Sequence, residues 1–208
     1  VILITGTSSG FGKSIAEKLH SQGYTVIGTS RNADKINSAF ETMKLDINNY
    51  EMSKNLIDNI INSYGKIDIL INNAGINITG PIETANMSDI KKVFDTNFFS
   101  HVNMIQKVLP NMRSNNKGLI INITSIAGYL GLPYWGTYCA SKSSFNIIAE
   151  SLNIELKKYN VDVVNISPGD YKTEISLNRV DRLESASPYY NEYKNVINSV
   201  NSKMKHGR

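Results

Sequence analysis

The chain has 208 residues, of which 41% are hydrophobic and 19% charged, and its formal net charge at neutral pH is +4. This length and composition predict one globular domain with a sizeable core. No apolar run approaches the roughly 18 residues that a membrane span needs. The basic residues are scattered along the chain, which disfavours a nucleic-acid-binding surface.

Cysteine and histidine are too few for several kinds of site. The single cysteine, Cys139, excludes a disulfide within this sequence and a cysteine-based zinc site. It also favours a reducing compartment, so we expect a cytoplasmic protein. His20, His101 and His206 lack the spacing of metal ligands, and no metal site is predicted.

The chain opens with a strand, a glycine-rich turn and a helix. Residues 1–5 form a short apolar run typical of a central parallel strand, and helical spacing extends over residues 13–22. Between them lies Gly-Thr-Ser-Ser-Gly-Phe-Gly, from Gly6 to Gly12. Glycines let the backbone approach a pyrophosphate, and a helix N-terminus offers unpaired N–H groups and a positive dipole end. The sequence therefore predicts a phosphate-binding turn.

Two kinds of nucleotide site compete for this turn. A P-loop has four residues between its first glycine and Gly-Lys-Ser/Thr, whereas five residues separate Gly6 from Gly12-Lys13-Ser14. No later apolar strand ends in a convincing metal-binding aspartate, so the NTPase interpretation is the weaker one. The order Thr-Gly-x-x-x-Gly-x-Gly also differs from the usual G-x-G-x-x-G of dinucleotide sites.

Strands and helices alternate along the rest of the chain. Apolar runs predict strands at 24–29, 42–45, 67–71, 119–123 and 161–166, and helical periodicity predicts helices at 50–64, 88–115, 138–157 and 189–205. This alternation predicts an α/β fold, a doubly wound parallel sheet of Rossmann type with helices on both faces, in a single domain. Ligands of such sheets bind at the carboxyl ends of the strands.

The candidate chemistry follows the strand at 119–123. That strand leads into Ser125, and a helical segment then carries Tyr138 and Lys142 four positions apart, which places both on one helix face. A hydroxyl, a phenol and an ammonium group brought together can move a proton on and off a carbonyl oxygen.

Tyr-x-x-x-Lys alone is a weak signal. A chain with 11 tyrosines contains it about once by chance, and two further copies begin at Tyr50 and Tyr190. Both lie in polar helical patterns, interpreted as solvated faces, and neither follows a strand that ends in serine. The context singles out Tyr138.

With its Thr-Gly-x-x-x-Gly-x-Gly turn, the Asn-Asn-Ala-Gly sequence after the strand at 67–71, and the Ser…Tyr-x-x-x-Lys set, the chain resembles the single-domain branch of the short-chain dehydrogenase/reductase family. The resemblance implies hydride transfer between a nicotinamide and a carbonyl or secondary alcohol. It implies a general acid/base, Tyr138, whose pKa Lys142 lowers while also holding the cofactor ribose. Ser125 would bind the substrate oxygen, and Asn97 would bend its helix and hold a water of the proton relay.

The resemblance also implies cofactor contacts. Asp46 would bind the adenine amino group, Ile47 would flank the ring, and Thr173 would hold the carboxamide or a phosphate. The full predicted set is Gly6, Ser8, Ser9, Gly10, Phe11, Gly12, Ser30, Arg31, Asp46, Ile47, Asn73, Ala74, Gly75, Tyr138, Lys142, Pro168, Gly169 and Thr173.

The end of the strand at 24–29 bears on cofactor choice. NAD enzymes commonly place an acid there for the ribose 2′-hydroxyl, but this chain has Ser30 and Arg31. A guanidinium fits a 2′-phosphate that an acid would repel, so NADP(H) is favoured over NAD(H). The second basic residue that some NADP-preferring relatives carry before Gly10 is here Ser9.

The predicted substrate is an apolar carbonyl or alcohol. Side chains expected near the nicotinamide are Ile76, Ile78, Tyr129, Leu130, Leu132, Tyr134, Trp135 and Tyr171. Segment 170–208 is expected to cover the substrate, and the given sequence stops before the strand that follows this segment in the family. The resemblance implies a homodimer or homotetramer built on the helices of Asn97 and Tyr138.

A second function stays open. The same fold can serve a non-catalytic NADP-binding sensor or interaction protein. The intact set of Asn97, Ser125, Tyr138 and Lys142 argues against it, since binding needs no acid. Loss of the last family strand would argue for it if the natural protein also lacks that strand.

Overall fold

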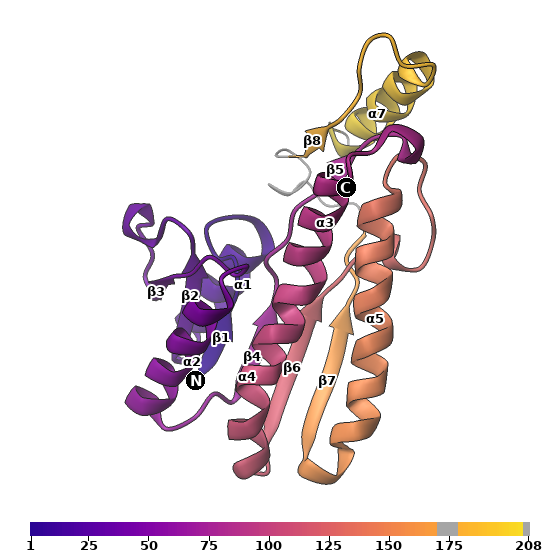
Figure 1. Ribbon diagram of the computed structural model, residues 1–208. Helices are drawn as coiled ribbons and strands as arrows, with labels where there is room; N and C mark the ends of the chain where they lie inside the picture. The colour runs from indigo at the N-terminus through magenta and orange to yellow at the C-terminus, as the bar shows by residue number, and fades with distance from the viewer. Residues whose placement is uncertain (170–178, 206–208) are drawn as a thin grey trace.

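A computed structural model describes residues 1–169 and 179–205 (Figure 1). Six parallel strands form one sheet in the order β3-β2-β1-β4-β6-β7. The order reverses between β1 and β4, which is where doubly wound sheets bind ligands. The predicted parallel sheet is confirmed, and the ends of its strands differ from the predicted ones by at most two residues. The strands are β1 (Ile2–Ile4), β2 (Val26–Ser30), β3 (Glu41–Lys44), β4 (Ile69–Asn72), β6 (Gly118–Ile123) and β7 (Val161–Ile166).

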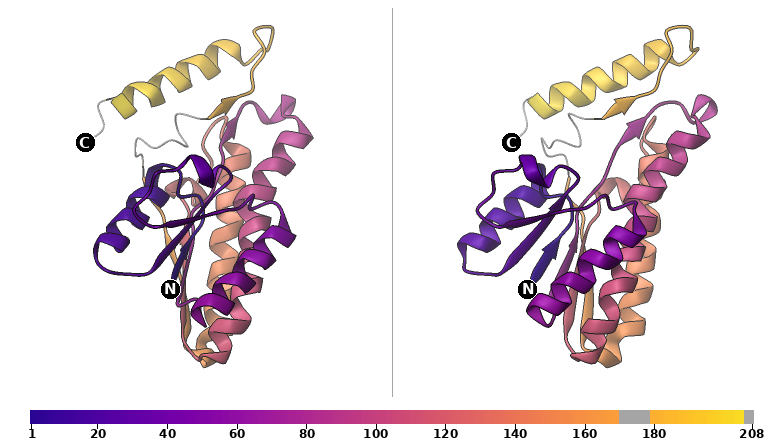
Figure 2. Two further views of the ribbon diagram at one scale, coloured as in Figure 1. Left: turned by 90° about the vertical axis from the view of Figure 1, so that its left-hand side faces the viewer. Right: turned by 60° about the vertical axis from the view of Figure 1, so that its left-hand side comes forward.

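Helices cover both faces of the sheet, as predicted (Figures 1 and 2). On one face, side chains of α2, α4 and α5 pack on strand residues such as Leu3, Leu70 and Ile120 in the main core. On the other face, Ala16 of α1 packs against Ile4. The helices are α1 (Gly10–Ser21), α2 (Tyr50–Tyr64), α3 (Met87–Phe94), α4 (Ser100–Ser114), α5 (Gly136–Leu156) and α7 (Tyr190–Lys205). None of the described helices is long and apolar enough to cross a membrane.

The helix predicted at 88–115 has a π-helical turn in its middle. Residues Asp95–Phe99 form this turn between α3 and α4, and the residues that join the three segments keep right-handed helical dihedrals. A π turn leaves backbone groups out of the regular ladder and often occurs at functional sites. The turn carries Asn97, whose side chain is fully buried.

A second, two-stranded sheet lies beyond the carboxyl ends of the main strands. β5 (Ile78–Thr79) pairs in parallel with β8 (Val180–Asp181), and α7 lies over the same end of the molecule (Figure 2). Thr79 Oγ1 donates to Asp181 Oδ1 at 2.7 Å and lies 2.8 Å from the Tyr193 hydroxyl of α7. These contacts fasten residues 179–205 to the loop that follows β4.

Candidate active site

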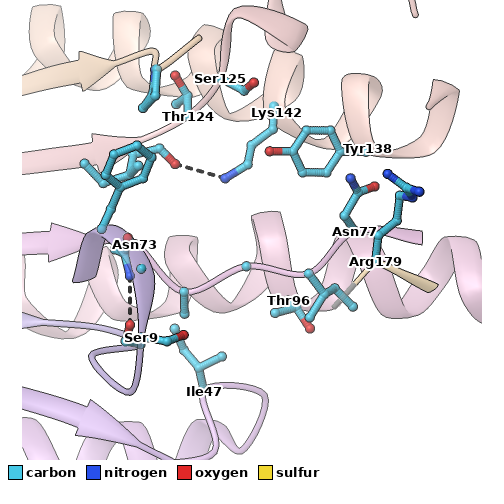
Figure 3. A pocket seen from close by; sticks show the side chains of 18 of the residues that line it. Ser9, Ile47, Asn73, Asn77, Thr96, Thr124, Ser125, Tyr138, Lys142 and Arg179 are labelled. Atoms are coloured by element: carbon cyan, nitrogen blue, oxygen red, sulfur yellow. Dashed lines mark hydrogen bonds between the residues drawn. The ribbon is translucent and has the colours of Figure 1, made fainter. Parts of the chain in front are cut away.

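A cavity of about 670 Å³ lies at the carboxyl edge of the sheet. It runs from the glycine turn, past the ends of β4 and β6, to the small sheet formed by β5 and β8 (Figure 3). Most of the predicted site residues line it: Gly6, Ser8, Ser9, Gly10, Phe11, Ser30, Arg31, Asp46, Ile47, Asn73, Ala74, Gly75, Ser125, Tyr138, Lys142, Pro168 and Gly169. Thr173 falls outside the described residues.

Asn73 locks the glycine turn onto the end of β4. Its Nδ2 donates to Thr5 O at 2.8 Å and to Gly6 O at 2.9 Å, and its backbone N–H donates to Thr5 Oγ1 at 2.9 Å. A Cβ at Gly12 would lie 2.3 Å from both Asn73 Nδ2 and Gly6 O. Gly12 does not line the cavity; it is required because α1 and Asn73 approach each other too closely for a side chain.

The glycine turn fits a dinucleotide. Gly6 and Gly10 have φ values of +71° and +57°, in the left-handed region that glycine tolerates best. Ser9 precedes α1 and makes no side-chain capping hydrogen bond, so the N-terminus of the helix is available to an anion. The hydroxyls of Ser8, Ser9 and Ser30 add polar groups to this end of the cavity.

The adenosine end of the cavity has a second basic residue, Lys35, that the sequence analysis did not identify. Arg31 lines the cavity and is exposed, and Lys35, on a short 3-10 helix (Ala33–Lys35), lines the same wall. Ser30 Oγ accepts the N–H of Asn32 at 3.2 Å, which shapes the turn between them. Two cations therefore lie near the position where a 2′-phosphate is expected.

Tyr138 and Lys142 face the cavity together with Ser125 (Figure 3). Tyr138 is 8% exposed and Lys142 2%. Lys142 Nζ donates to Ile123 O at 2.9 Å and lies 5.9 Å from the centre of the Tyr138 ring. Ser125 Oγ accepts the N–H of Ala127 at 3.2 Å, which fixes the hydroxyl at the end of β6. The predicted triad is thus brought together at one wall.

The protein alone does not lower the pKa of Tyr138. Burial raises this pKa above 10, and a hydrogen bond with Ser125 acts in the opposite direction. Burial also lowers the pKa of Lys142 to about 8. The expected lowering of the Tyr138 pKa by Lys142 is therefore not seen in the protein without cofactor, where burial is the largest cause and raises this pKa.

Asn97 does not line the cavity, unlike the other three predicted catalytic residues. Its Oδ1 accepts the N–H of Ile76 at 2.9 Å, and its Nδ2 donates to Ile76 O at 3.0 Å and Ser141 Oγ at 3.1 Å. Both N–H groups of the amide are therefore used within the protein. Asn97 ties the loop after β4 to α5, the helix of Tyr138.

The substrate end of the cavity matches the prediction in part. Ile76, Leu130, Leu132 and Trp135 line it, whereas Ile78, Tyr129 and Tyr134 do not, and Tyr171 lies outside the described residues. Sequence reasoning also missed several residues that line the cavity. Among them are Asn77, Thr96, Arg179, Val196 and Val200.

A comparison with protein-family models matches residues 1–184 to the family described as short chain dehydrogenase. The chain belongs to the short-chain dehydrogenase family. Among its relatives, 3-ketodihydrosphingosine reductase of Bacteroides thetaiotaomicron is 41% identical over 179 residues, which are 86% of this chain and 66% of the relative. The matched part of the chain thus spans just under two thirds of the length of that reductase.

Two solved structures share the fold of this chain. A short-chain dehydrogenase from Streptomyces avermitilis aligns with a TM-score of 0.84 at 29% identity, covering 92% of this chain and 73% of that one. ElxO with NADP bound aligns with a TM-score of 0.80 at 28% identity, covering 83% and 74%.

Proposed function

We propose that the protein is an NADP(H)-dependent oxidoreductase that moves a hydride between the nicotinamide and a carbonyl or secondary alcohol. The observation that carries the proposal is the meeting of buried Tyr138 and Lys142 with Ser125 in the same cavity as the glycine turn. Membership of the short-chain dehydrogenase family supports it. When bound, the cofactor supplies or accepts the hydride, while the protein supplies orientation and the proton.

Tyr138 is the proposed general acid/base. In the reductive direction its phenol donates a proton to the carbonyl oxygen, and Ser125 Oγ donates a hydrogen bond to the same oxygen, which stabilises its developing negative charge. Lys142 favours the tyrosinate through its charge and holds the cofactor ribose. Asn97 fixes the loop after β4 through its bond with Ile76 N–H. We also propose that the π turn that carries Asn97 holds a water molecule of the proton path.

The preference for NADP(H) rests on Arg31 and Lys35. Both line the adenosine end of the cavity, and neither Ser30 nor Asn32 beside them is acidic. An Arg–phosphate contact is bidentate and charge-assisted, whereas an acid at this place would repel the 2′-phosphate. The related ElxO binds NADP in its solved structure.

An apolar substrate fits the far end of the cavity. Its apolar lining residues include Leu130, Leu132, Trp135, Val196 and Val200. The relative named 3-ketodihydrosphingosine reductase supports a substrate with a large hydrocarbon part.

We also propose a homodimer or homotetramer in the cytoplasm. The outer face of α5 exposes 65% of Ile147 and 78% of Ile154, and covering such a face with a second copy would bury apolar surface. The lone cysteine, Cys139, is buried as a free thiol, which suits a reducing compartment.

A screen of NADPH oxidation tests the proposal. The full-length natural protein is mixed with NADPH and a panel of apolar ketones and aldehydes, and absorbance at the nicotinamide band is followed. We expect turnover with at least one panel member. Tight NADPH binding without oxidation of any compound would favour the sensor alternative.

A further inference from the structure

Two polar side chains line the substrate end of the cavity where β5 and β8 meet. Asn77 directly precedes β5, and Arg179 directly precedes β8. Both side chains line the cavity beyond Tyr138, at the opposite end from Ser9 (Figure 3). Neither residue has a role in the hydride or proton transfer described above.

The pairing of the two strands places these side chains together. Ile78 lies opposite Val180, and the N–H of Val180 donates to Asn77 O at 3.0 Å. Successive side chains of a strand point to opposite faces. Asn77 and Arg179, each one position earlier, therefore project to the same face of the ribbon, away from Ile78 and Val180.

Asn77 presents a buried acceptor without a partner. The residue is 9% exposed, and within the described part of the chain nothing donates to its Oδ1. Buried polar atoms are nearly always hydrogen-bonded, and an unsatisfied one destabilises the protein. A donor on a bound substrate would satisfy this oxygen.

Arg179 is a buried donor held in a fixed orientation. Its side chain is 7% exposed and its guanidinium lies 5.5 Å from the centre of the Trp135 ring. Asp181 accepts from Nε at 2.6 Å and from Nη2 at 3.4 Å. A guanidinium has five N–H donors, and no residue in the described ranges accepts from Nη1. Asp181 also balances the positive charge, so the pair attracts anions only weakly.

We propose that Asn77 and Arg179 form a subsite for a neutral hydroxyl group of the substrate. A hydroxyl can donate to Asn77 Oδ1 and accept from Arg179 at once. A carboxylate cannot donate to Asn77, and an ammonium cannot accept from Arg179 and is repelled by it. The inference rests on the proposed function and narrows the substrate class to hydroxy-ketones, and the corresponding diols, with an apolar body.

Matched ketones test the subsite. The values of kcat/KM with NADPH are compared for 2-octanone and for the hydroxy-2-octanones that carry the hydroxyl at successive carbons. A lost hydrogen bond in a buried site corresponds to about tenfold to a hundredfold. We expect the best hydroxy isomer to exceed 2-octanone by that factor, and Asn77→Leu and Arg179→Met each to remove most of the preference.

Arg182→Met is the control variant. Arg182 lies three positions beyond Arg179, pairs with Asp89 through Nε at 2.8 Å, and does not line the cavity. Its hydroxy-ketone preference should equal that of the natural protein. Because the preference is a ratio for one protein preparation, a partly unfolded variant does not imitate the loss. An unchanged ratio in Asn77→Leu, or no preference for any isomer in the natural protein, would overturn the inference.

A binding measurement separates this inference from the proposed function. Trp135 is the only tryptophan of the sequence and lines the subsite, so its fluorescence reports ligands there. In the presence of NADP, the hydroxy-ketone should bind about tenfold more tightly than 2-octanone, and Asn77→Leu should abolish the difference. Binding preference without any turnover would refute the proposed function and keep the subsite. Turnover with equal affinities for both ketones would refute the subsite and keep the proposed function.

Discussion

Lys142 carries its ammonium group in one of the least exposed positions of the molecule. It is 2% exposed, its described hydrogen bond is to Ile123 O, and burial lowers its pKa to about 8. The carbonyl at the end of β6 thus fixes the charge beside Tyr138. Burying the ammonium group of Lys142 lowers the free energy of unfolding. Such a cost is expected where a buried charge is needed for binding or catalysis.

The pH dependence of unfolding tests this burial. The pKa of Lys142 falls from 10.5 to about 8 on folding, so between these pH values the unfolded chain binds more protons and the free energy of unfolding rises with pH. In Lys142→Met this contribution is absent. Chemical denaturation without cofactor at pH 7.5 and pH 10 should show the natural protein gaining on the order of 2 kcal/mol relative to the variant. Equal pH dependence of the two proteins would contradict the burial.

Arg31 can be tested by reversing its charge. In Arg31→Asp the acid repels a 2′-phosphate and can bind a ribose hydroxyl, so the ratio of kcat/KM for NADPH over NADH should fall by about tenfold to a hundredfold. Lys18→Asp on the exposed side of α1 makes the same change in net charge away from the cavity and serves as the control. The same ratio in both variants would show that Arg31 is not the discriminating residue.

Site residues that lie close together in the sequence could be predicted, and those that meet only through the pairing of distant segments could not. Ser125, Tyr138 and Lys142 lie close in sequence, after a strand and on one helix face, so their meeting follows from helix and strand periodicity. Asn77 and Arg179 are about a hundred positions apart and meet through two strands of two residues each. No pattern in either segment predicts that pairing.

At the scale of elements, the turn after β1 and the loop after β4 behave as one unit. The sequence predicted each separately as a strand followed by small residues. The structure joins them through the Asn73 side chain, which spans Thr5 O and Gly6 O. Periodicity could not predict the π turn at Asp95–Phe99, because one inserted residue shifts a helix face without interrupting the helical pattern.

Gly12→Ala tests the joint between these elements. The added Cβ would meet Asn73 Nδ2 and the backbone oxygen Gly6 O at 2.3 Å, so the turn must shift. We expect a loss of about 1–3 kcal/mol in the free energy of unfolding, typical of overpacking, and weaker NADPH binding. Gly136→Ala at the start of α5 is the control, because a Cβ there meets nothing within 4 Å. Denaturant unfolding and NADPH titration of both variants decide the matter, and equal stabilities would refute the close-contact explanation.

At the scale of the whole molecule, alternating strands and helices were enough to predict the sheet and its ligand-binding edge. Right-handed crossovers between parallel strands leave few topologies, and the observed order β3-β2-β1-β4-β6-β7 is one of them. The placement of residues 179–205 could not be predicted from the alternation of elements. It depends on hydrogen bonds of Thr79 with Asp181 and Tyr193, which lie far from Thr79 in the sequence. The cavity becomes one continuous site only when these distant segments come together.

The most direct test of the account is Tyr138→Phe. The variant keeps the ring and loses the phenol, so turnover of an active carbonyl should fall by about 10²–10⁴ while the Kd for NADPH stays within about threefold. Tyr190→Phe is the matched control: Tyr190 and Lys194 form another Tyr-x-x-x-Lys pair, with Lys194 Nζ 4.4 Å from the Tyr190 ring centre, outside the cavity. Its turnover should equal that of the natural protein. If Tyr138→Phe keeps more than about a hundredth of the natural rate, Tyr138 is not the general acid/base.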